Sequence, residues 1–223
     1  MEHQVKGLIV KLIDYKEADK LASIFSLEKG LITAKFAGVK RDKAKFKSAA
    51  QPFTFANFTL FEKKDHLTVT GVDVLDSFPC VLQNYNKTIC GYIILDILRS
   101  ILPKQKPEQD IFVLTISALK NLETNNEYVA TIDYILKFIA FSGMGVQFED
   151  LNYVYLDTFS GNFCLDRVEG STQIDKKVYE ILKAINNGEV VDENPTKLKQ
   201  ALRLLHNILF IKFGEDVGSF QFL

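Results

Sequence analysis

The hydrophobic pattern of this chain changes near residue 80, and this change constrains the fold more than any other feature of the sequence. Before it, short segments rich in β-branched and aromatic residues alternate with turns. After it, apolar residues recur every three or four positions, which is typical of packed helices. Strands that precede helices do not fit a parallel sheet with crossover helices. The chain is therefore predicted to be an α+β protein with one domain at 1–80 and a second, helical domain at 81–223.

The first domain is predicted to hold five strands, at 5–12, 21–27, 31–39, 53–61 and 67–75. A polar loop at 14–19 follows the first strand, Gly30 allows a turn with positive φ, and Gly71 suggests a bulge. Five strands with a long connection after the third fit a β-barrel of the OB type, whose loops and open face commonly bind nucleic acid. An SH3-like barrel is the alternative.

The second domain is predicted to contain five helices, at 82–101, 107–122, 127–142, 175–187 and 195–213. A small hairpin is expected at 153–157 and 163–167, around Gly161. Asn194 is the expected N-terminal cap of the last helix, and Gly214 is its expected stop. Aromatic residues at helical spacing are interpreted as core rather than as a binding surface; they include Tyr134, Phe138, Phe141 and Phe210.

The connection after the third strand is the most basic stretch of the chain. Between Val39 and Lys47 it carries five cations and one anion, although the whole protein has a formal charge of −1. Residues 1–80 hold 13 Lys and Arg against 10 Asp and Glu, a balance of +3, and the remaining residues hold 14 against 18, a balance of −4. A local excess of this kind indicates a polyanionic partner such as a phosphate backbone. The alternative is a solvated lysine-rich loop.

Several functional classes are not supported by the composition. The longest apolar run, 89–98, is too short to span a bilayer, and the first residues lack the features of a signal peptide, so a cytoplasmic protein without membrane contact is expected. The three cysteines, Cys80, Cys90 and Cys164, are too widely spaced for a disulfide framework or a zinc site. No HExxH, GxSxG, P-loop or Rossmann glycine pattern is present. The sequence therefore predicts neither an enzyme nor a bound cofactor.

Carboxylates gather in a turn-rich stretch of the second domain, at Glu149, Asp150, Asp157 and Asp166. Acidic residues in such stretches cap turns more often than they bind metal, so capping is the favoured interpretation. The alternative is a metal-dependent nuclease built on these four side chains.

Short motifs in a fixed order are similar to those of one bacterial family. They are Gly-Leu-Ile-Val at 7–10, Asp-Tyr-Lys-Glu-Ala-Asp-Lys at 14–20, Gly-Leu-Ile at 30–32, Ala-Gly-Val-Lys-Arg at 37–41, Ala-Gln-Pro-Phe at 50–53, Gly-Met-Gly-Val-Gln-Phe at 143–148, and the final stretch 198–222. Over most of its length the chain resembles the RecO family of recombination mediators, which have an N-terminal OB fold and a helical C-terminal domain. Many members bind a structural zinc with four cysteines after the Gly-rich turn. This chain has no cysteine between 148 and 157, so no metal is expected.

The resemblance implies a DNA repair protein that binds single- and double-stranded DNA and anneals complementary strands. With RecR, such a protein helps RecA replace single-stranded DNA-binding protein on gapped DNA. The phosphate contacts are then expected from Lys35, Lys40, Arg41, Lys43, Lys45 and Lys47. In an extended loop Lys43, Lys45 and Lys47 share one side. Phe46 then stacks on a base or anchors the loop, and anchoring is favoured. The alternative function is another OB-type module for RNA or a protein.

By the same resemblance, the acidic and apolar C-terminal tail of single-stranded DNA-binding protein docks on the helical domain. Such a tail needs an apolar pocket rimmed by cations. The candidate residues are Lys120, Tyr134, Lys137, Phe138 and Arg203. Cations of this kind are more often plain surface charges, and the acidity of this half does not favour an acidic partner.

Overall fold

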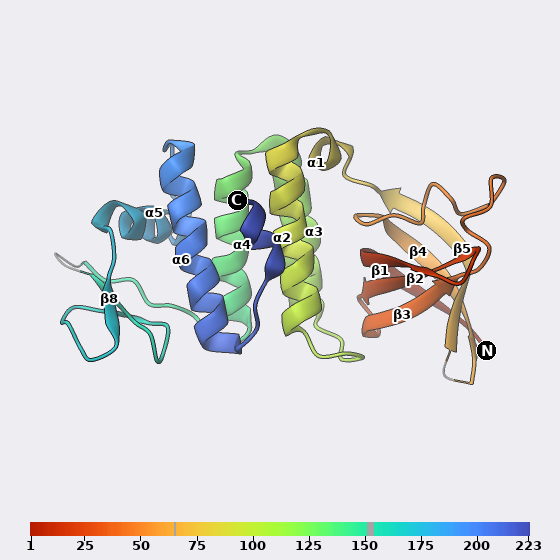
Figure 1. Ribbon diagram of the computed structural model, residues 1–223, viewed down its shortest axis with the longest axis horizontal. Helices are drawn as coiled ribbons and strands as arrows, with labels where there is room; N and C mark the ends of the chain where they lie inside the picture. The colour runs from red at the N-terminus through yellow and green to blue at the C-terminus, as the bar shows by residue number, and fades with distance from the viewer. Residues whose placement is uncertain (65, 151–153) are drawn as a thin grey trace. The chain divides into compact units, whose positions relative to one another are not determined.

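The computed structural model describes residues 1–64, 66–150 and 154–223 of the chain. These residues form two compact units, shown in Figure 1. The first unit comprises Met1–Pro79 and Ile101–Val113, and the second comprises Cys80–Ser100 and Leu114–Leu223. Residues 101–113 therefore belong to the first unit, although they follow residues of the second unit in the sequence. A single boundary at residue 80, as expected from the sequence, does not describe this division.

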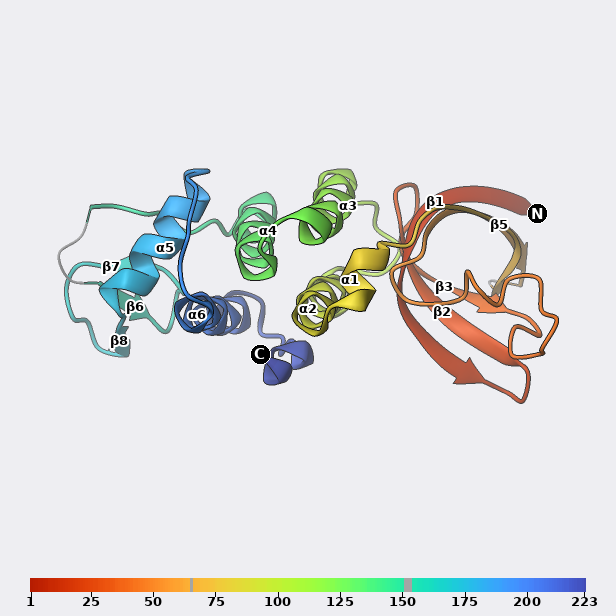
Figure 2. The ribbon, with the colours of Figure 1, turned by 90° about the horizontal axis from the view of Figure 1, so that it is seen from above.

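The first unit is built on a closed barrel in the strand order β1-β2-β3-β5-β4. Its strands are β1 (Glu2–Tyr15), β2 (Asp19–Ser26), β3 (Gly30–Phe36), β4 (Phe55–Lys63) and β5 (His66–Asp76). All neighbouring strands are antiparallel except β3 and β5, which are parallel. Figure 2 shows the strands curving around one interior. This order, with the long connection between β3 and β4, confirms the predicted α+β class with an OB-type barrel.

Alternation along each strand separates the core from the outer face of the barrel. On β3, Ile32, Ala34 and Phe36 point into the buried core cluster, together with Phe58 and Leu60 of β4. The intervening residues of β3 therefore point outward, because successive strand side chains face opposite sides of a sheet. Of these outward residues Leu31 is buried, whereas Thr33 is exposed and Lys35 is half-buried.

The strand boundaries differ from the sequence expectation at the first loop. Asp14 pairs with Lys20 and Tyr15 with Asp19, so β1 and β2 extend through most of the predicted loop. A turn remains only at residues 16–18. The bulge near Gly71 is confirmed, because the register of β4 and β5 shifts between Thr59 and Leu60.

Residues 101–113 join the barrel unit through backbone contact and aromatic packing. The backbone N–H of Gln105 donates to the carbonyl of Leu31 at 3.1 Å. Gly30 has a φ of 66°, and a Cβ atom there would lie 2.1 Å from the carbonyl oxygen of Lys106. Phe112 packs on the rings of two barrel residues, one of them Phe25 at 5.5 Å between centroids. A glycine at position 30 is therefore required both by the turn and by this close approach.

The second unit is mainly helical. Its elements, with α3 beginning in the first unit, are α1 (Pro79–Gln83), α2 (Tyr85–Ile101), α3 (Gln109–Thr124), α4 (Glu127–Phe141), β6 (Tyr155–Asp157), β7 (Phe163–Cys164), β8 (Ser171–Gln173), α5 (Lys176–Asn186), α6 (Pro195–Phe213) and the 3-10 helix η1 (Gly218–Phe222). The bounds of α6, its Asn194 cap and its Gly214 stop are confirmed. The helices formed by the described residues do not combine the length and apolarity that crossing a membrane requires.

Three expectations for this unit were wrong in detail. Pro107 is not the first residue of α3, which begins at Gln109. The predicted hairpin is a three-stranded sheet, because β8 pairs with β6. Tyr153, the first residue of the predicted hairpin, lies outside the described residues. Tyr134 and Phe138 are core residues as predicted, but Phe141 and Phe210 are 57% and 54% exposed. Helical spacing alone did not reveal that these two aromatic residues face solvent.

Candidate nucleic-acid interface

The basic stretch lies in the connection between β3 and β4, residues 37–54, which we call the basic connection. It is folded into successive turns: Arg41 N–H donates to the Gly38 carbonyl and Ala44 N–H to the Arg41 carbonyl, both at 3.1 Å, and Lys47 N–H donates to the Ala44 carbonyl at 3.2 Å. The extended loop assumed from the sequence is therefore wrong. Alternation along an extended chain cannot assign Lys43, Lys45 and Lys47 to one side.

The basic connection is fixed to the barrel at several points. Gly38 N–H donates to the Asp19 carboxylate at 2.7 Å, and Lys40 N–H donates to the Ala18 carbonyl at 3.0 Å. Val39 is buried, and Phe46 packs against the barrel core cluster. This packing is what the anchoring interpretation of Phe46 expects. The cations of the connection are thus carried on a turn structure with defined attachment.

Two lysines of the basic connection already have acidic neighbours. Lys40 Nζ donates to Asp14 at 2.9 Å, and this hydrogen bond lowers the pKa of the Asp14 carboxyl. Lys47 Nζ lies 3.6 Å from Asp42. Such exposed pairs contribute little stability and are readily exchanged for a phosphate.

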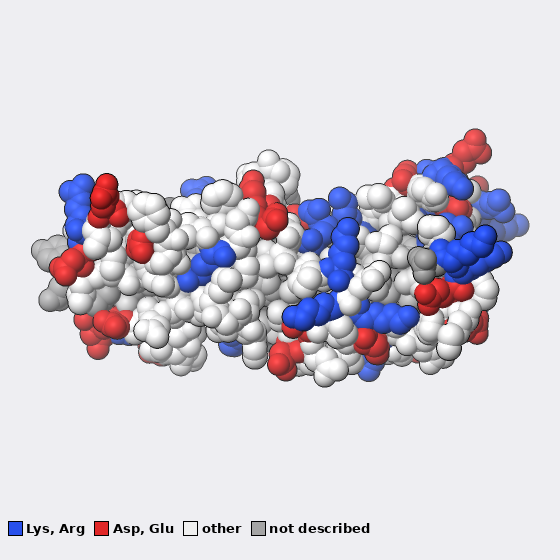
Figure 3. Space-filling view, turned by 90° about the horizontal axis from the view of Figure 1, so that it is seen from below, with Lys and Arg blue, Asp and Glu red and all other residues white. Residues whose placement is uncertain are grey.

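The other cations of the connection are more accessible. Lys45 Nζ lies 5.1 Å from the centroid of the Phe46 ring. Arg41 and Lys43 are exposed, and no ion pair is found for either within residues 1–64, 66–150 and 154–223. Figure 3 shows lysine and arginine side chains on this face of the barrel unit, with acidic side chains interspersed among them. The connection therefore keeps an excess of positive charge that a phosphate backbone can neutralise.

A second basic surface lies over β3, with further lining residues from β1, β2 and β5, and the sequence did not reveal it. It is a groove of about 550 Å³, which we call the β2–β3 groove. It is lined by Tyr15, Lys16, Leu21, Leu31, Ile32, Thr33, Lys35, His66, Leu67, Thr68, Lys104 and Gln105. None of these described lining residues is acidic.

The strand register explains the composition of the groove. Lys35 pairs with Leu21 on β2 and with Thr68 on β5, so the three side chains lie in one row across the outer face. Lys104 forms an isolated parallel bridge with Leu31, which brings a third lysine to the groove beside Lys35 and Lys16. A site for a nucleotide chain combines apolar surface for the bases, polar groups for hydrogen bonds and cations for the phosphates. The groove has all three.

Of the residues that line this groove, only Lys35 was among the phosphate contacts expected from the sequence. Tyr15 and Lys16 were assigned to a polar loop, and Lys104 lies in a distant segment between two prolines. The return of residues 101–113 to the barrel is a long-range contact, so local patterns carried no signal for it.

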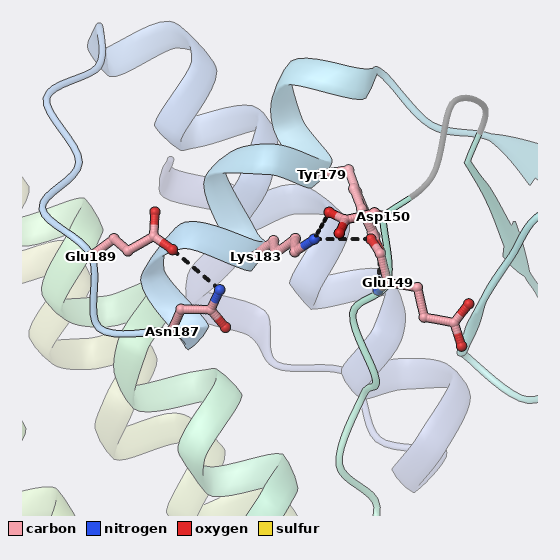
Figure 4. Close-up of polar contacts among 6 residues, drawn as sticks. All are labelled: Glu149, Asp150, Tyr179, Lys183, Asn187 and Glu189. Atoms are coloured by element: carbon pink, nitrogen blue, oxygen red, sulfur yellow. Dashed lines mark hydrogen bonds and ion pairs between the residues drawn. The ribbon is translucent and has the colours of Figure 1, made fainter.

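The four carboxylates of the nuclease hypothesis do not converge. Figure 4 shows the Asp150 carboxylate facing Lys183, whereas the Glu149 carboxylate points away from it. Asp157 accepts hydrogen bonds from Ser160 Oγ and Phe159 N–H, in that order the main causes of its lowered pKa. Within the part of the chain that the structure describes, no three His, Cys, Asp or Glu residues are grouped to hold a metal ion.

Two family models match this chain. The one described as Recombination protein O N terminal matches residues 1–78, and the one described as Recombination protein O C terminal matches residues 82–215. The chain belongs to the RecO family. The resemblance inferred from the short motifs is thereby confirmed, and the RecO models cover both the strand-rich and the helical part.

Relatives named DNA repair protein RecO extend over nearly the whole chain. The one from Clostridium novyi is 26% identical over 236 residues, which cover 98% of this chain and 92% of the relative. The one from Clostridium perfringens is 26% identical and covers 81% of this chain and 78% of the relative. The one from Pelotomaculum thermopropionicum is 21% identical and covers 99% and 93%.

The residues expected to receive a partner's tail in this RecO-family chain are not brought together. Tyr134 and Phe138 are fully buried on α4, so they cannot line a surface pocket. Lys137 is paired with Asp133 on the exposed side of the same helix, at 2.7 Å. Of the remaining cations, Lys120 is exposed, and Arg203 donates to the carbonyl of Leu223 at 3.1 Å. The predicted pocket on Tyr134 and Phe138 is therefore corrected.

Proposed function

We propose that this protein is a DNA repair and recombination mediator. It binds single- and double-stranded DNA, anneals complementary strands and, with RecR, helps load RecA onto strands covered by single-stranded DNA-binding protein. The observation that carries the proposal is the basic connection on an OB-type barrel, within a chain that belongs to the RecO family.

Charge neutralisation is the physical basis of the proposed annealing. Phosphates repel one another, and lysines that neutralise them release condensed counterions and lower the cost of bringing two strands together. The exposed cations Arg41, Lys43 and Lys45 make contacts of this kind without reading bases. No bond is made or broken in this process, so we propose a role that is not enzymatic and needs no cofactor.

Partner proteins belong to the same proposal. The acidic tail of single-stranded DNA-binding protein would dock on the helical unit, with the exposed cations Lys120, Lys137 and Arg203 as rim residues. Its apolar anchor would use surface aromatic residues such as Phe141 or Phe210 in place of the buried pair on α4. RecA would be an indirect partner, because it would bind the strand from which single-stranded DNA-binding protein has been displaced.

An annealing assay tests this proposal. Complementary oligonucleotides, bare or coated with single-stranded DNA-binding protein, are mixed with and without the protein, and duplex formation is followed by fluorescence quenching. We expect faster annealing of the coated strands, because a mediator must work on covered DNA. An unchanged rate on both bare and coated strands would contradict the proposal.

Two further readouts of the same mixture separate the alternatives. A competing RNA of equal length that displaces DNA with higher affinity would favour an RNA-binding module. Shortening of the labelled strand in Mg²⁺ or Mn²⁺ would reveal a nuclease, since a mediator leaves its strands intact.

A further inference from the structure

We propose that residues 215–223, which we call the tail segment, are autoinhibitory: they occupy a peptide-binding groove between α2 and α6, and a partner peptide binds there only after they leave. The partner that this groove fits is a short peptide in which acidic residues are followed by an aromatic residue. The inference rests on the proposed function only in expecting an acidic partner on the helical unit. It adds a regulatory contact made by the chain itself.

The tail segment runs back along the helices after α6 ends. The helix stops at Gly214, whose φ of 72° is a left-handed conformation that glycine adopts without steric cost. Figures 1 and 2 show the following residues, with η1, lying against α2 and α6. Val217 and Phe220 are buried, with 0% and 5% of their surface exposed. The tail segment therefore fills an apolar groove within the helical unit.

Side chains of both helices contact the tail segment. On α6, His206 Nε2 lies 2.9 Å from a carboxylate oxygen of Asp216, and the His206 ring stacks on Phe220 with 4.4 Å between centroids and 11° between planes. On α2, the Asp96 carboxylate accepts a hydrogen bond from Ser219 Oγ. The groove thus contacts an acidic side chain, a hydroxyl group and an aromatic ring of the peptide that it holds.

Two arginines add positive charge around the groove. Arg203 of α6 donates to the carbonyl of Leu223 at 3.1 Å. Arg99 of α2 donates to Asp96 at 2.9 Å and so offsets the negative charge of that carboxylate. The tail segment itself begins with two acids, at 215–216. Groove and segment are therefore complementary in charge as well as in apolar surface, and this complementarity defines the partner chemistry.

The tail segment is attached to the helices through side chains. Its own backbone hydrogen bonds are local: Phe220 N–H donates to the Val217 carbonyl and Leu223 N–H to the Phe220 carbonyl, both at 3.2 Å. Among residues 1–64, 66–150 and 154–223, no backbone hydrogen bond joins the tail segment to α2 or α6. Detachment therefore leaves the backbone hydrogen bonds of the helices intact, as in segments that open locally at low cost in free energy.

A tail segment and a partner that share one groove compete for it. The partner peptide binds only the open form, so its apparent dissociation constant is the intrinsic value divided by the open fraction. A substitution that weakens the tail segment without altering the groove raises the open fraction and strengthens partner binding. If the segment were only a part of the core, the same substitution would lower stability and create no affinity for a peptide.

The test uses the full chain and a fluorescent peptide with the sequence of residues 214–223, whose binding is followed by anisotropy. Phe220→Ala removes the stacked ring of the tail segment and leaves the groove residues unchanged. We expect this variant to bind the peptide roughly tenfold more tightly than the wild-type protein does. The matched control is Phe222→Ala, because Phe222 belongs to the same segment but is 58% exposed. It should bind the peptide as weakly as the wild-type protein.

A substitution in the groove should have the opposite effect. Adding His206→Ala to Phe220→Ala keeps the tail segment weakened but removes the ring and the charge partner that the peptide needs, so the gain in affinity should be lost. Circular dichroism and thermal melting establish that each variant is folded. If Phe220→Ala does not fold, Asp216→Asn replaces it, since this change keeps the size of the side chain and weakens its pairing with His206. It too should strengthen peptide binding.

The outcomes separate this inference from the proposed function. If the folded Phe220→Ala or Asp216→Asn variant binds the peptide no more tightly than the wild-type protein, the tail segment is part of the core and the inference is wrong. The inference is also wrong if the double variant with His206→Ala keeps the gain. Annealing by the wild-type protein is measured separately, so the proposed function stands or fails by that result.

Discussion

Thr54 places a hydroxyl group in the interior of the barrel unit, beside the fully buried Phe53. The backbone of Thr54 is well paired, since its carbonyl accepts from Ile9 N–H at 2.9 Å. Its Oγ1 is a buried side-chain atom with no hydrogen-bond partner in the described part of the chain. A buried hydroxyl without a partner destabilises the folded state, because it has lost its hydrogen bonds to water and forms none within the protein.

Replacing Thr54 by valine should therefore stabilise the protein by about 1 kcal/mol, because the shape is kept and the unpaired hydroxyl is lost. Urea denaturation measures the change. Thr54→Ser, which keeps the hydroxyl and removes the methyl group, is the control and should destabilise. A destabilised valine variant would show that the hydroxyl has a partner.

Asp175 is a residue whose charge stabilises a helix end. Its carboxylate accepts from Lys177 N–H and Val178 N–H as the cap of α5, and from Lys197 Nζ at 2.7 Å. These bonds, with that of Lys197 the largest, lower its pKa from the ordinary value of 3.8. A lowered pKa means stability that is present above pH 3.8 and is lost as the pH falls through the folded-state value.

Asp175→Ala should accordingly lower the melting temperature at neutral pH, and its difference from wild type should shrink as the pH falls well below 3.8. Asp175→Asn should lose less at neutral pH, because asparagine also caps helices but does not pair with lysine. Melting curves across this pH range provide the measurement. A difference that does not depend on pH would contradict the account.

At the scale of elements, the basic connection is the part whose charge was predicted and whose conformation was not. Its cations are visible in the sequence, but hydrogen-bonded turns have no periodic signature that distinguishes them from an extended loop. The long helix α6 was predicted to its exact bounds, because Asn194 and Gly214 are local signals.

Shorter and more distant features were not predictable in the same way. α1 and β8 have five and three residues, too few for a hydrophobic period to show. Lys104 reaches the β2–β3 groove only because residues 101–113 return to the barrel. One part of the candidate site, the basic connection, could therefore be predicted from its charge. The β2–β3 groove could not, because it is formed by contacts between residues that are distant in the sequence.

Phe46 tests whether the connection depends on its anchor. Phe46→Ala should destabilise the protein by about 1–2 kcal/mol, less than a fully buried phenylalanine, because the ring is only partly buried. It should also weaken binding, since the neighbouring cations lose their fixed placement.

Phe46→Leu separates anchoring from stacking. Leucine can pack on the core cluster but cannot stack on a base, so we expect near wild-type stability and DNA affinity. A leucine variant that is stable yet binds single strands poorly would show that Phe46 acts as a stacking residue.

At the scale of the whole molecule, positive charge is concentrated in the part of the sequence that forms the barrel. Residues 1–80 carry 13 Lys and Arg against 10 Asp and Glu, a formal balance of +3. The remaining residues carry 14 against 18, a balance of −4. Such a distribution attracts phosphates to one part of the chain more than to the other. We propose that the basic connection neutralises phosphates.

The salt dependence of single-strand binding tests this claim most directly. The comparison is between wild type, K43A/K45A/K47A, and the control K120A/K137A/R203A, which removes three cations from the helical unit. At roughly 0.7 per phosphate contact, the connection variant should lower the log–log slope by about 2, similarly for strands of different sequence. The control should keep the wild-type slope. An unchanged slope for K43A/K45A/K47A, with its circular dichroism spectrum intact, would contradict the account.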